Sequence, residues 1–473
     1  MARFTDIYGY ELSAGDLSGA APVDPARLSM AWGEAAAGLL AHRPDFADRL
    51  DTVLTIAPGF AYGWALKGLG CMLLGRRELV ALARAACTEA KAAIASYDAS
   101  QSERLVVEAL AMLLDDRWRA GADLLDQALH LSPQDALLVK LSHAVRFVLG
   151  DSRGMRRSIE NVLAGYNETH PHAGYVYGCY AFALEETADY NEAEHWGRRG
   201  LELNADDAWG LHAVAHVHEM RVDPETGKRW LMDNKPAWQN SNNFKVHVWW
   251  HMALYLLEEG DHAAVLDLYD REIRADQTDD YRDIANGASM LSRLELEGIA
   301  VGDRWDELAD KSAARIDDAC LAFADLHYLL SLTGAGRMGE AEQLVARMER
   351  SGEQNLGDSG VITRRAAAPM AKALYQYARG NHAAAIEAFR PADEQLYRIG
   401  GSHAQRDVFK RIMTDAAINA GTLDMARKIL KERAILRCGA DRFSNERTTA
   451  ARISSISPQT PGSGGTDGDR MLG

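Results

Sequence analysis

The stretch HVWWHMALYLLEEGDHAAVLDLYDREI (residues 247–273) decides the fold of this chain. Its first half places Trp250, Leu254 and Leu257 three to four residues apart, which is typical of the apolar face of a helix. Gly260 permits a tight turn, and the second half again spaces alanines and leucines along one helical face. The stretch therefore predicts two helices that pack against each other around a short turn.

The same design recurs along the chain, for example in residues 174–207 and 371–390. Neighbouring units begin at Asp135, His172 and Asp207, which is close to the 34-residue period of tetratricopeptide repeats. Only 12 of the 473 residues are proline, which also favours helices. The sequence predicts an all-α, tetratricopeptide-type α-solenoid, a superhelix of about eleven helix pairs.

The repeat pattern divides the chain into three parts. Residues 1–24 form an N-terminal arm before the first amphipathic segment, and residues 25–438 form the helical-repeat domain. Residues 439–473 lack apolar periodicity and contain the polar run SISPQTPGSGGTDGD, so we expect a disordered C-terminal tail.

Charge and cysteine content limit the classes of partner. The formal net charge is −16, without a local basic stripe, which argues against nucleic acid and anionic membranes as partners. The five cysteines form no CxxC pair, and the N-terminus lacks the apolar run of a signal peptide. We expect a cytoplasmic protein with reduced cysteines.

Four segments resemble the tetratricopeptide repeat protein 38 family. They are LHAVAHVHEM (211–220), NNFKVHVWWHMALYLLEEGDHAAVLDLYD (242–270), SMLSRLELEG (289–298) and GGSHAQRDVF (400–409). The resemblance covers most of the chain and implies a curved α-solenoid. It implies no particular reaction.

The placement of the fifteen histidines is uneven. Nine fall on, or at the start of, the first helix of a pair, and in a tetratricopeptide array that helix lines the concave surface. These nine are His143, His172, His212, His216, His218, His247, His251, His327 and His403. The bias indicates a polar inner surface, although packing of one helix against the next would also explain any single member.

Two histidine pairs share the spacing that places both rings on one helical face. His212 and His216 are four residues apart, and His247 and His251 repeat this spacing about one repeat later. We expect the pairs to converge, with Glu219 one turn beyond His216. Such a group suits one divalent metal, the only candidate cofactor, or a metal-free acid/base site. No glycine-rich phosphate loop follows a strand, so we expect no nucleotide cofactor.

A second candidate group lies in the segment that begins with Ser402. Asp407 lies one turn after His403 and is expected to orient its imidazole, while Arg406 is expected to clamp a substrate anion. Ser402 is expected to cap the helix. A capped helix with a surface ion pair is the competing interpretation.

Two functional hypotheses follow, and the histidine bias slightly favours the first. In the first, the superhelix encloses a pocket for hydrolytic or lyase-type acid/base chemistry on a small polar or anionic substrate. The catalytic candidates are His212, His216, His251, His403 and Asp407; the substrate-binding candidates are Arg406, Trp250, Tyr255 and His327. In the second, an open groove binds a peptide or partner protein.

Overall fold

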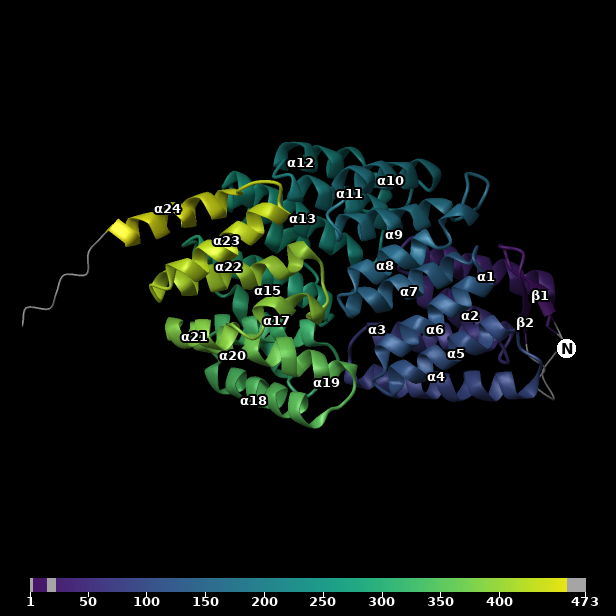
Figure 1. Cartoon of the computed structure of the whole chain (residues 1–473). Coiled ribbons are helices and arrows are strands. Elements are labelled where there is room, and N and C mark those ends of the chain that lie inside the picture. Colours follow the sequence, from purple (N-terminus) through teal and green to yellow (C-terminus); the bar gives the residue numbers. More distant parts are fainter. Residues whose placement is uncertain (1–2, 15–22, 457–473) are drawn as a thin grey trace, which may run out of the picture.

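We analysed a computed structural model of the chain, which describes residues 3–14 and 23–456, with side chains up to residue 451. Helices α1 to α24 follow one another in chain order (Figure 1). Apart from α19 and α24, they form eleven antiparallel pairs within the described residues, which confirms the predicted tetratricopeptide-type α-solenoid.

The first helices of the pairs carry all nine of the inner histidines predicted from the sequence, either within the helix or at its N-cap. These helices are α1 (Pro25–Leu40), α3 (Ala61–Leu73), α5 (Gln101–Leu114), α7 (Ala136–Val148), α9 (Ala173–Glu185), α11 (Ala208–Met220), α13 (Phe244–Glu259), α15 (Tyr281–Leu296), α17 (Ala322–Gly334), α20 (Ala368–Ala378) and α22 (His403–Asn419).

The second helices form the outer layer. They are α2 (Phe46–Ile56), α4 (Arg77–Ser96), α6 (Trp118–Leu131), α8 (Ser152–Glu160), α10 (Tyr190–Leu203), α12 (Pro224–Asp233), α14 (His262–Leu268), α16 (Arg304–Ala313), α18 (Met338–Gln354), α21 (His382–Phe389) and α23 (Leu423–Leu436). None of the described helices combines the length and apolar character that crossing a bilayer requires.

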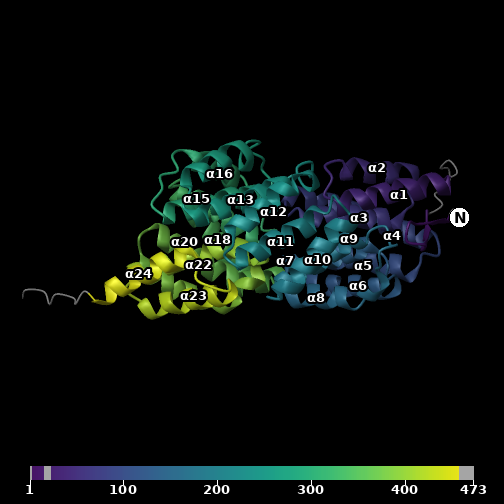
Figure 2. The same cartoon turned by 90° about the horizontal axis from the view of Figure 1, so that it is seen from above.

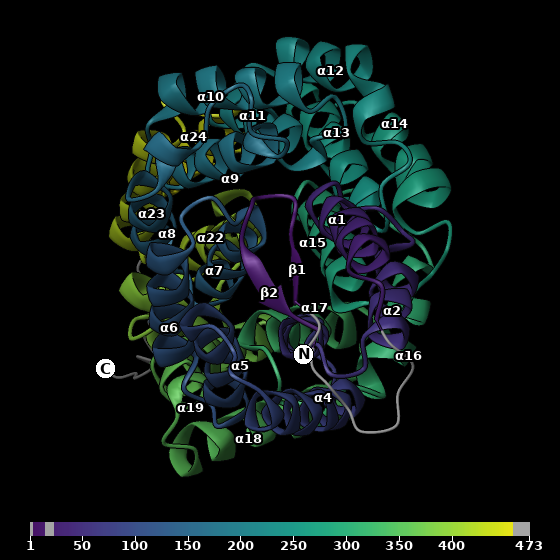
Figure 3. The ribbon, with the colours of Figure 1, turned by 90° about the vertical axis from the view of Figure 1, so that its right-hand side faces the viewer.

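A short hairpin precedes the first helix. The N-terminal arm forms a hairpin of strands β1 (Arg3–Thr5) and β2 (Glu11–Ser13), in which Phe4 lies opposite Leu12. Phe4 is buried against Phe60 at the start of α3. Viewed end-on, the helices form a ring and the hairpin lies within its outline (Figure 3).

Two successive turns of the superhelix contact each other through segments that are far apart in sequence. Arg315 pairs with Glu78 at 2.8 Å. Gly150 and Gly400 have φ of +65° and +81°, and a Cβ on Gly150 would lie 1.9 Å from the Tyr397 carbonyl oxygen. Glycine is therefore required where the α7–α8 turn meets the segment before α22.

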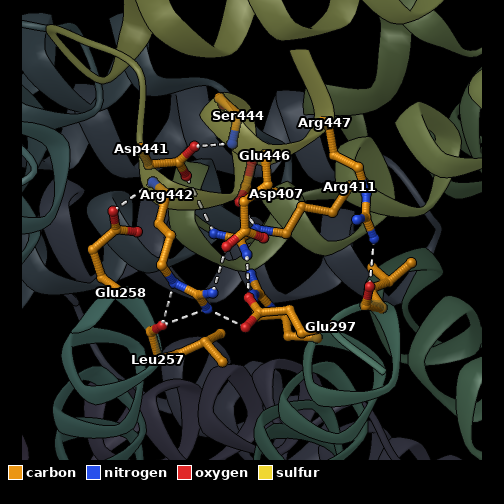
Figure 4. A network of polar contacts seen from close by, with 12 residues as sticks. Leu257, Glu258, Glu297, Asp407, Arg411, Asp441, Arg442, Ser444, Glu446 and Arg447 are labelled. Carbon is orange, nitrogen blue, oxygen red and sulfur yellow. Dashed lines mark hydrogen bonds and ion pairs between the residues drawn. The ribbon is translucent and has the colours of Figure 1, made fainter. Parts of the chain in front are cut away.

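The expectation of a disordered tail from residue 439 is wrong for its described part. Residues 442–456 form helix α24, at the opposite end of the elongated molecule from α1 and α2 (Figures 1 and 2). Phe443 is buried, and Arg442 donates to the Leu257 carbonyl oxygen at 2.8 Å and pairs with Glu297 (Figure 4). Residues 457–473, the rest of the predicted tail, lie outside the described residues.

Asp441 joins this tail to the repeats through buried charges. Its carboxylate accepts from Arg433 at 2.7 Å and from Arg411 at 3.2 Å, and it is 0% exposed. Burial alone would raise the pKa of Asp441, but Arg433, Arg437 and Arg411 hold it far below its usual range. The tail is therefore held by ion pairs, which apolar periodicity does not reveal.

Replacing Asp441 with Asn should lower the free energy of unfolding by about 3 kcal/mol, because it removes one of the carboxylates that neutralise a group of buried arginines. Urea unfolding followed by circular dichroism measures this change. Glu446→Gln is the matched control, because Glu446 is an exposed partner of Arg442, and should change stability by less than about 0.5 kcal/mol. Equal stability of Asp441→Asn and wild type would contradict the assignment.

Candidate functional site

Four histidines converge between α11 and α13, as the two matched spacings predicted. The rings of His212, His216, His247 and His251 have centroids 4.4 to 4.9 Å apart in the pairs that contact each other. One nitrogen from each ring lies within 4.8 Å of the others. His212 and His216 face each other directly through their Nε2 atoms at 2.9 Å.

Three of the four imidazoles point their Nδ1 atom at a polar side chain outside the group. His247 Nδ1 lies 2.9 Å from Asn286 Oδ1, and His251 Nδ1 lies 3.2 Å from Glu219 Oε2. His216 Nδ1 lies 3.6 Å from Glu185 Oε2. Metal-binding histidines commonly have an oxygen partner on the nitrogen that does not bind the metal.

Burial keeps these imidazoles neutral. The exposed fraction is 0% for His216 and His251 and 2% for His212. Burial first, and then the neighbouring imidazoles, lower the pKa of His212 well below its usual value. Burial lowers the pKa of His247 to about 4. Neutral imidazoles have the free lone pairs that a divalent metal needs.

Two buried carboxyl groups adjoin the histidines but differ in their partners. Glu219, predicted to join the group, contacts His251 and accepts from Arg437 at 3.1 Å. Glu185 has no hydrogen-bond partner on either oxygen. Burial, and then Glu186 and Glu219, raise its pKa well above the usual value, which favours the protonated, neutral form of Glu185.

A chamber of about 470 Å³ lies beside the histidine group, inside the ring of helices. His212 and His247 form part of its wall. The remaining wall comes mostly from α1, α2, α3, α7, the start of α15 and the segment before α22. The chamber therefore exists only because the two turns of the superhelix meet.

The predicted pairing of His403 with Asp407 is not formed. Asp407 is held by Arg433 at 2.6 Å and Arg411 at 2.8 Å (Figure 4), and these guanidinium groups keep its pKa far below the usual range although burial would raise it. His403 instead lies 3.1 Å from the Glu186 carbonyl oxygen. Spacing alone predicted a pair, but arginines on α22 and α23 take the carboxylate.

Arg406 does not serve as a free anion clamp. It pairs with Glu186 at 3.2 Å and donates to the Gly401 carbonyl oxygen. Ser402 caps α22 as predicted, accepting from the Gln405 amide. This segment therefore joins α22 to α9 through Glu186.

The three other predicted substrate contacts lie in packing between helices, away from the chamber wall. Trp250 donates to Ser289 Oγ at 3.0 Å, and its ring stacks on His247. Tyr255 donates to the Ala215 carbonyl oxygen at 2.6 Å. His327 contacts the Phe323 carbonyl oxygen at 2.8 Å. The polar atoms of Trp250 and Tyr255 thus join neighbouring repeats, whereas His327 bonds within its own helix, α17.

The other inner histidines do not join the four. His143 lines the chamber on α7, and His172 contacts Tyr8 of the hairpin at 2.8 Å. His218 is buried on α11, with neither ring nitrogen hydrogen-bonded. The histidine bias therefore predicted the inner surface correctly but not its division into separate environments.

Sequence reasoning missed Lys140 and Glu185. Both are buried side chains on first helices, beside the chamber or the histidine group. A lysine or glutamate inside an otherwise apolar first helix was the available signal, because such residues are rarely buried without a reason.

Comparisons with known proteins add only general likeness. No protein-family model matches the sequence. The solved structure of Naa15/Naa10 bound to HypK-THB is similar with 14% identity and a TM-score of 0.25, over 93% of this chain and 69% of that one. Yeast Tom70 is similar with 12% identity and a TM-score of 0.35, over 92% of this chain and 89% of that one.

Acid should destabilise the metal-free protein through these histidines. The folded-state pKa of His247 is about 4 against 6.5 for a free side chain, so the unfolded chain binds the proton more tightly. Stability should be highest above pH 6.5 and fall as the pH drops towards 4. In His247→Gln the fall should be shallower, by up to about 1.4 kcal/mol per pH unit.

Urea unfolding in the presence of a chelator, at several pH values, measures this slope. His195→Gln is the control, because His195 is exposed on α10. The same slope in His247→Gln and wild type would show that His247 is not held neutral by burial.

Proposed function

We propose that this helical-repeat protein binds one divalent metal at His212, His216, His247 and His251 and uses it on a small molecule in the adjoining chamber. The observation that carries the proposal is the shared orientation of three imidazoles. Each directs Nδ1 to Asn286, Glu219 or Glu185, and one nitrogen from each of the four rings lies within 4.8 Å of the others.

The donor set fits a transition metal. Four neutral imidazoles suit zinc, nickel, copper or iron rather than magnesium or calcium, which prefer oxygen ligands. Buried ring nitrogens without a hydrogen-bond partner, among them His212 Nδ1 and His251 Nε2, are costly unless something binds there. When bound, such a metal supplies Lewis-acid polarisation or an activated water.

Side chains of the protein itself provide a path for proton transfer. Burial favours the protonated form of Glu185, which lies 3.6 Å from His216, and His216 contacts His212 at the chamber wall. When no metal occupies the facing nitrogens of these two rings, a proton can pass between this buried acid and the chamber through them. This supports hydrolytic or lyase-type acid/base chemistry on a small polar or anionic substrate.

The size and position of the chamber favour a small molecule over an extended peptide. The chamber lies between two turns of the superhelix, and a volume of about 470 Å³ suits a ligand of drug-like size. His403 and Asp407 take a positioning role in this proposal, because each is bound to other protein groups and neither lines the chamber.

A scaffold that binds a peptide or partner protein is the second candidate function. The tetratricopeptide-type fold itself favours it, because curved repeat arrays generally present binding surfaces. Naa15/Naa10 is bound to HypK-THB in its own structure, but that likeness is too slight to place a partner on this chain.

Membership of the tetratricopeptide repeat protein 38 family is also a proposal, supported by the four segments quoted from the sequence. A cytoplasmic location is a further proposal. It is supported by the five free cysteines, none of which is paired in the structure.

Purified protein should contain about one transition metal per chain, measured by mass spectrometry after growth in metal-supplemented medium. The His212→Ala/His251→Ala double variant should lose it, because two of the four donors are removed. Asn286→Ala should weaken zinc affinity by about tenfold, because Asn286 holds the ring of His247.

His218→Ala is the matched control, since His218 is buried on the same helix but outside the group, and should retain full metal content. Absence of metal from wild type, together with no zinc binding in titrations, would refute the metal proposal. The metal-free acid/base pocket and the scaffold would then remain.

A further inference from the structure

Lys140 is a buried cation without a carboxylate partner. It lies on α7, is 8% exposed and forms part of the chamber wall. None of the ion pairs found among the described residues includes it. Burial lowers its pKa, against the smaller opposing effects of Cys179 and Asp207. An unpaired buried charge is costly, so the site is incomplete on its own.

The neighbours of Lys140 hold an ammonium group but do not neutralise it. Its Nζ lies 3.1 Å from His42 Nε2 and 4.3 Å from the centre of the Trp209 ring. Burial, then Lys140 and Arg282, lower the pKa of His42 well below its usual value, so that its imidazole is a neutral acceptor. A neutral ring and an aromatic face stabilise a cation, yet leave its charge available to a ligand.

Other basic residues of the wall are already engaged. Lys67 pairs with Asp51 at 2.6 Å, and Arg282 pairs with Asp280 at 2.6 Å. Arg398 is partly exposed and donates to Gln395. Arg43 pairs with Asp206 at 3.1 Å. The buried carboxyl group of the wall, Asp283, accepts from Thr278 and Asn243, and burial raises its pKa. Lys140 is thus the buried basic residue of the wall without a carboxylate partner.

Unpartnered polar atoms lie around the same chamber. The ring nitrogens of His143, Nε1 of Trp209 and Nδ2 of Asn286 are buried without a hydrogen-bond partner, and all three residues line the wall. Apolar side chains such as Phe46 and Leu66 line other parts of it. The chamber thus offers hydrogen-bonding groups together with apolar surface.

We infer that the chamber binds a small monocarboxylate with an aromatic or aliphatic body, and that Lys140 binds its carboxylate. One unpaired ammonium matches one negative charge, which favours a monocarboxylate over a phosphate or a dicarboxylate. The apolar wall would cover the body of the ligand. The inference deepens the proposed function, because His212 and His247 line the same chamber as Lys140.

The probes are 4-phenylbutyrate and its neutral counterpart 4-phenylbutan-1-ol, titrated calorimetrically into the full-length protein with and without zinc. Wild type should bind the carboxylate at least about tenfold more tightly than the alcohol, because only the carboxylate satisfies Lys140. In Lys140→Met this preference should disappear. Lys67→Met is the matched control, because Lys67 lines the chamber but has Asp51 as its partner, and it should keep the preference.

Stability without ligand gives a second measurement. Lys140→Met should unfold at a temperature about 2 °C or more above wild type, because it removes an unpaired buried charge. A lysine whose role is only structural would give a lower unfolding temperature in this variant. Such a decrease, equal binding of the two probes, or no binding of the carboxylate to wild type would each overturn the inference.

The metal proposal and the monocarboxylate inference can be refuted independently of each other. If zinc does not bind while carboxylate binding still depends on Lys140, the metal proposal is refuted and the monocarboxylate inference stands. If zinc binds but the Lys140→Met variant keeps the preference for the carboxylate, the inference is refuted and the metal proposal stands.

Discussion

The contact between successive turns of the superhelix is the constraint on which the other features depend. Gly150 and Gly400 allow the two backbones to meet, and the pair between Arg315 and Glu78 joins the same two turns elsewhere. Without this contact the first helices would face an open groove. With it, they line a chamber beside which burial keeps the imidazoles neutral, and Lys140 lies in its wall without a carboxylate partner.

Much of the fold was predictable because its information is local. The spacing of apolar residues within 247–273, and its recurrence, predicts both the helix pairs and their number. The packed helix α24 was not predictable in this way. It is held by Asp441 and Arg442, whose partners lie on α13, α15, α22 and α23, and such long-range ion pairs leave no periodic trace in the sequence.

The convergence of the four histidines was also predictable from local spacing. His212 and His216 share a face because four residues make about one helical turn, and α13 repeats the arrangement one repeat later. Asp407 shows the limit of this reasoning, because its spacing from His403 is right but arginines from α23 and its own helix take its carboxylate. The position of Lys140 inside an apolar helix could be recognised from the sequence, but its neighbour His42, in the turn after α1, could not.

X-ray absorption spectroscopy of the zinc-loaded protein tests the central claim most directly, because it identifies the atoms that surround the metal. The account predicts a first shell of nitrogen and oxygen only, with the outer scattering of at least three imidazoles, at a group where one nitrogen from each of four rings lies within 4.8 Å of the others. A shell containing sulfur, or one with a single imidazole, would place the metal elsewhere and contradict the account.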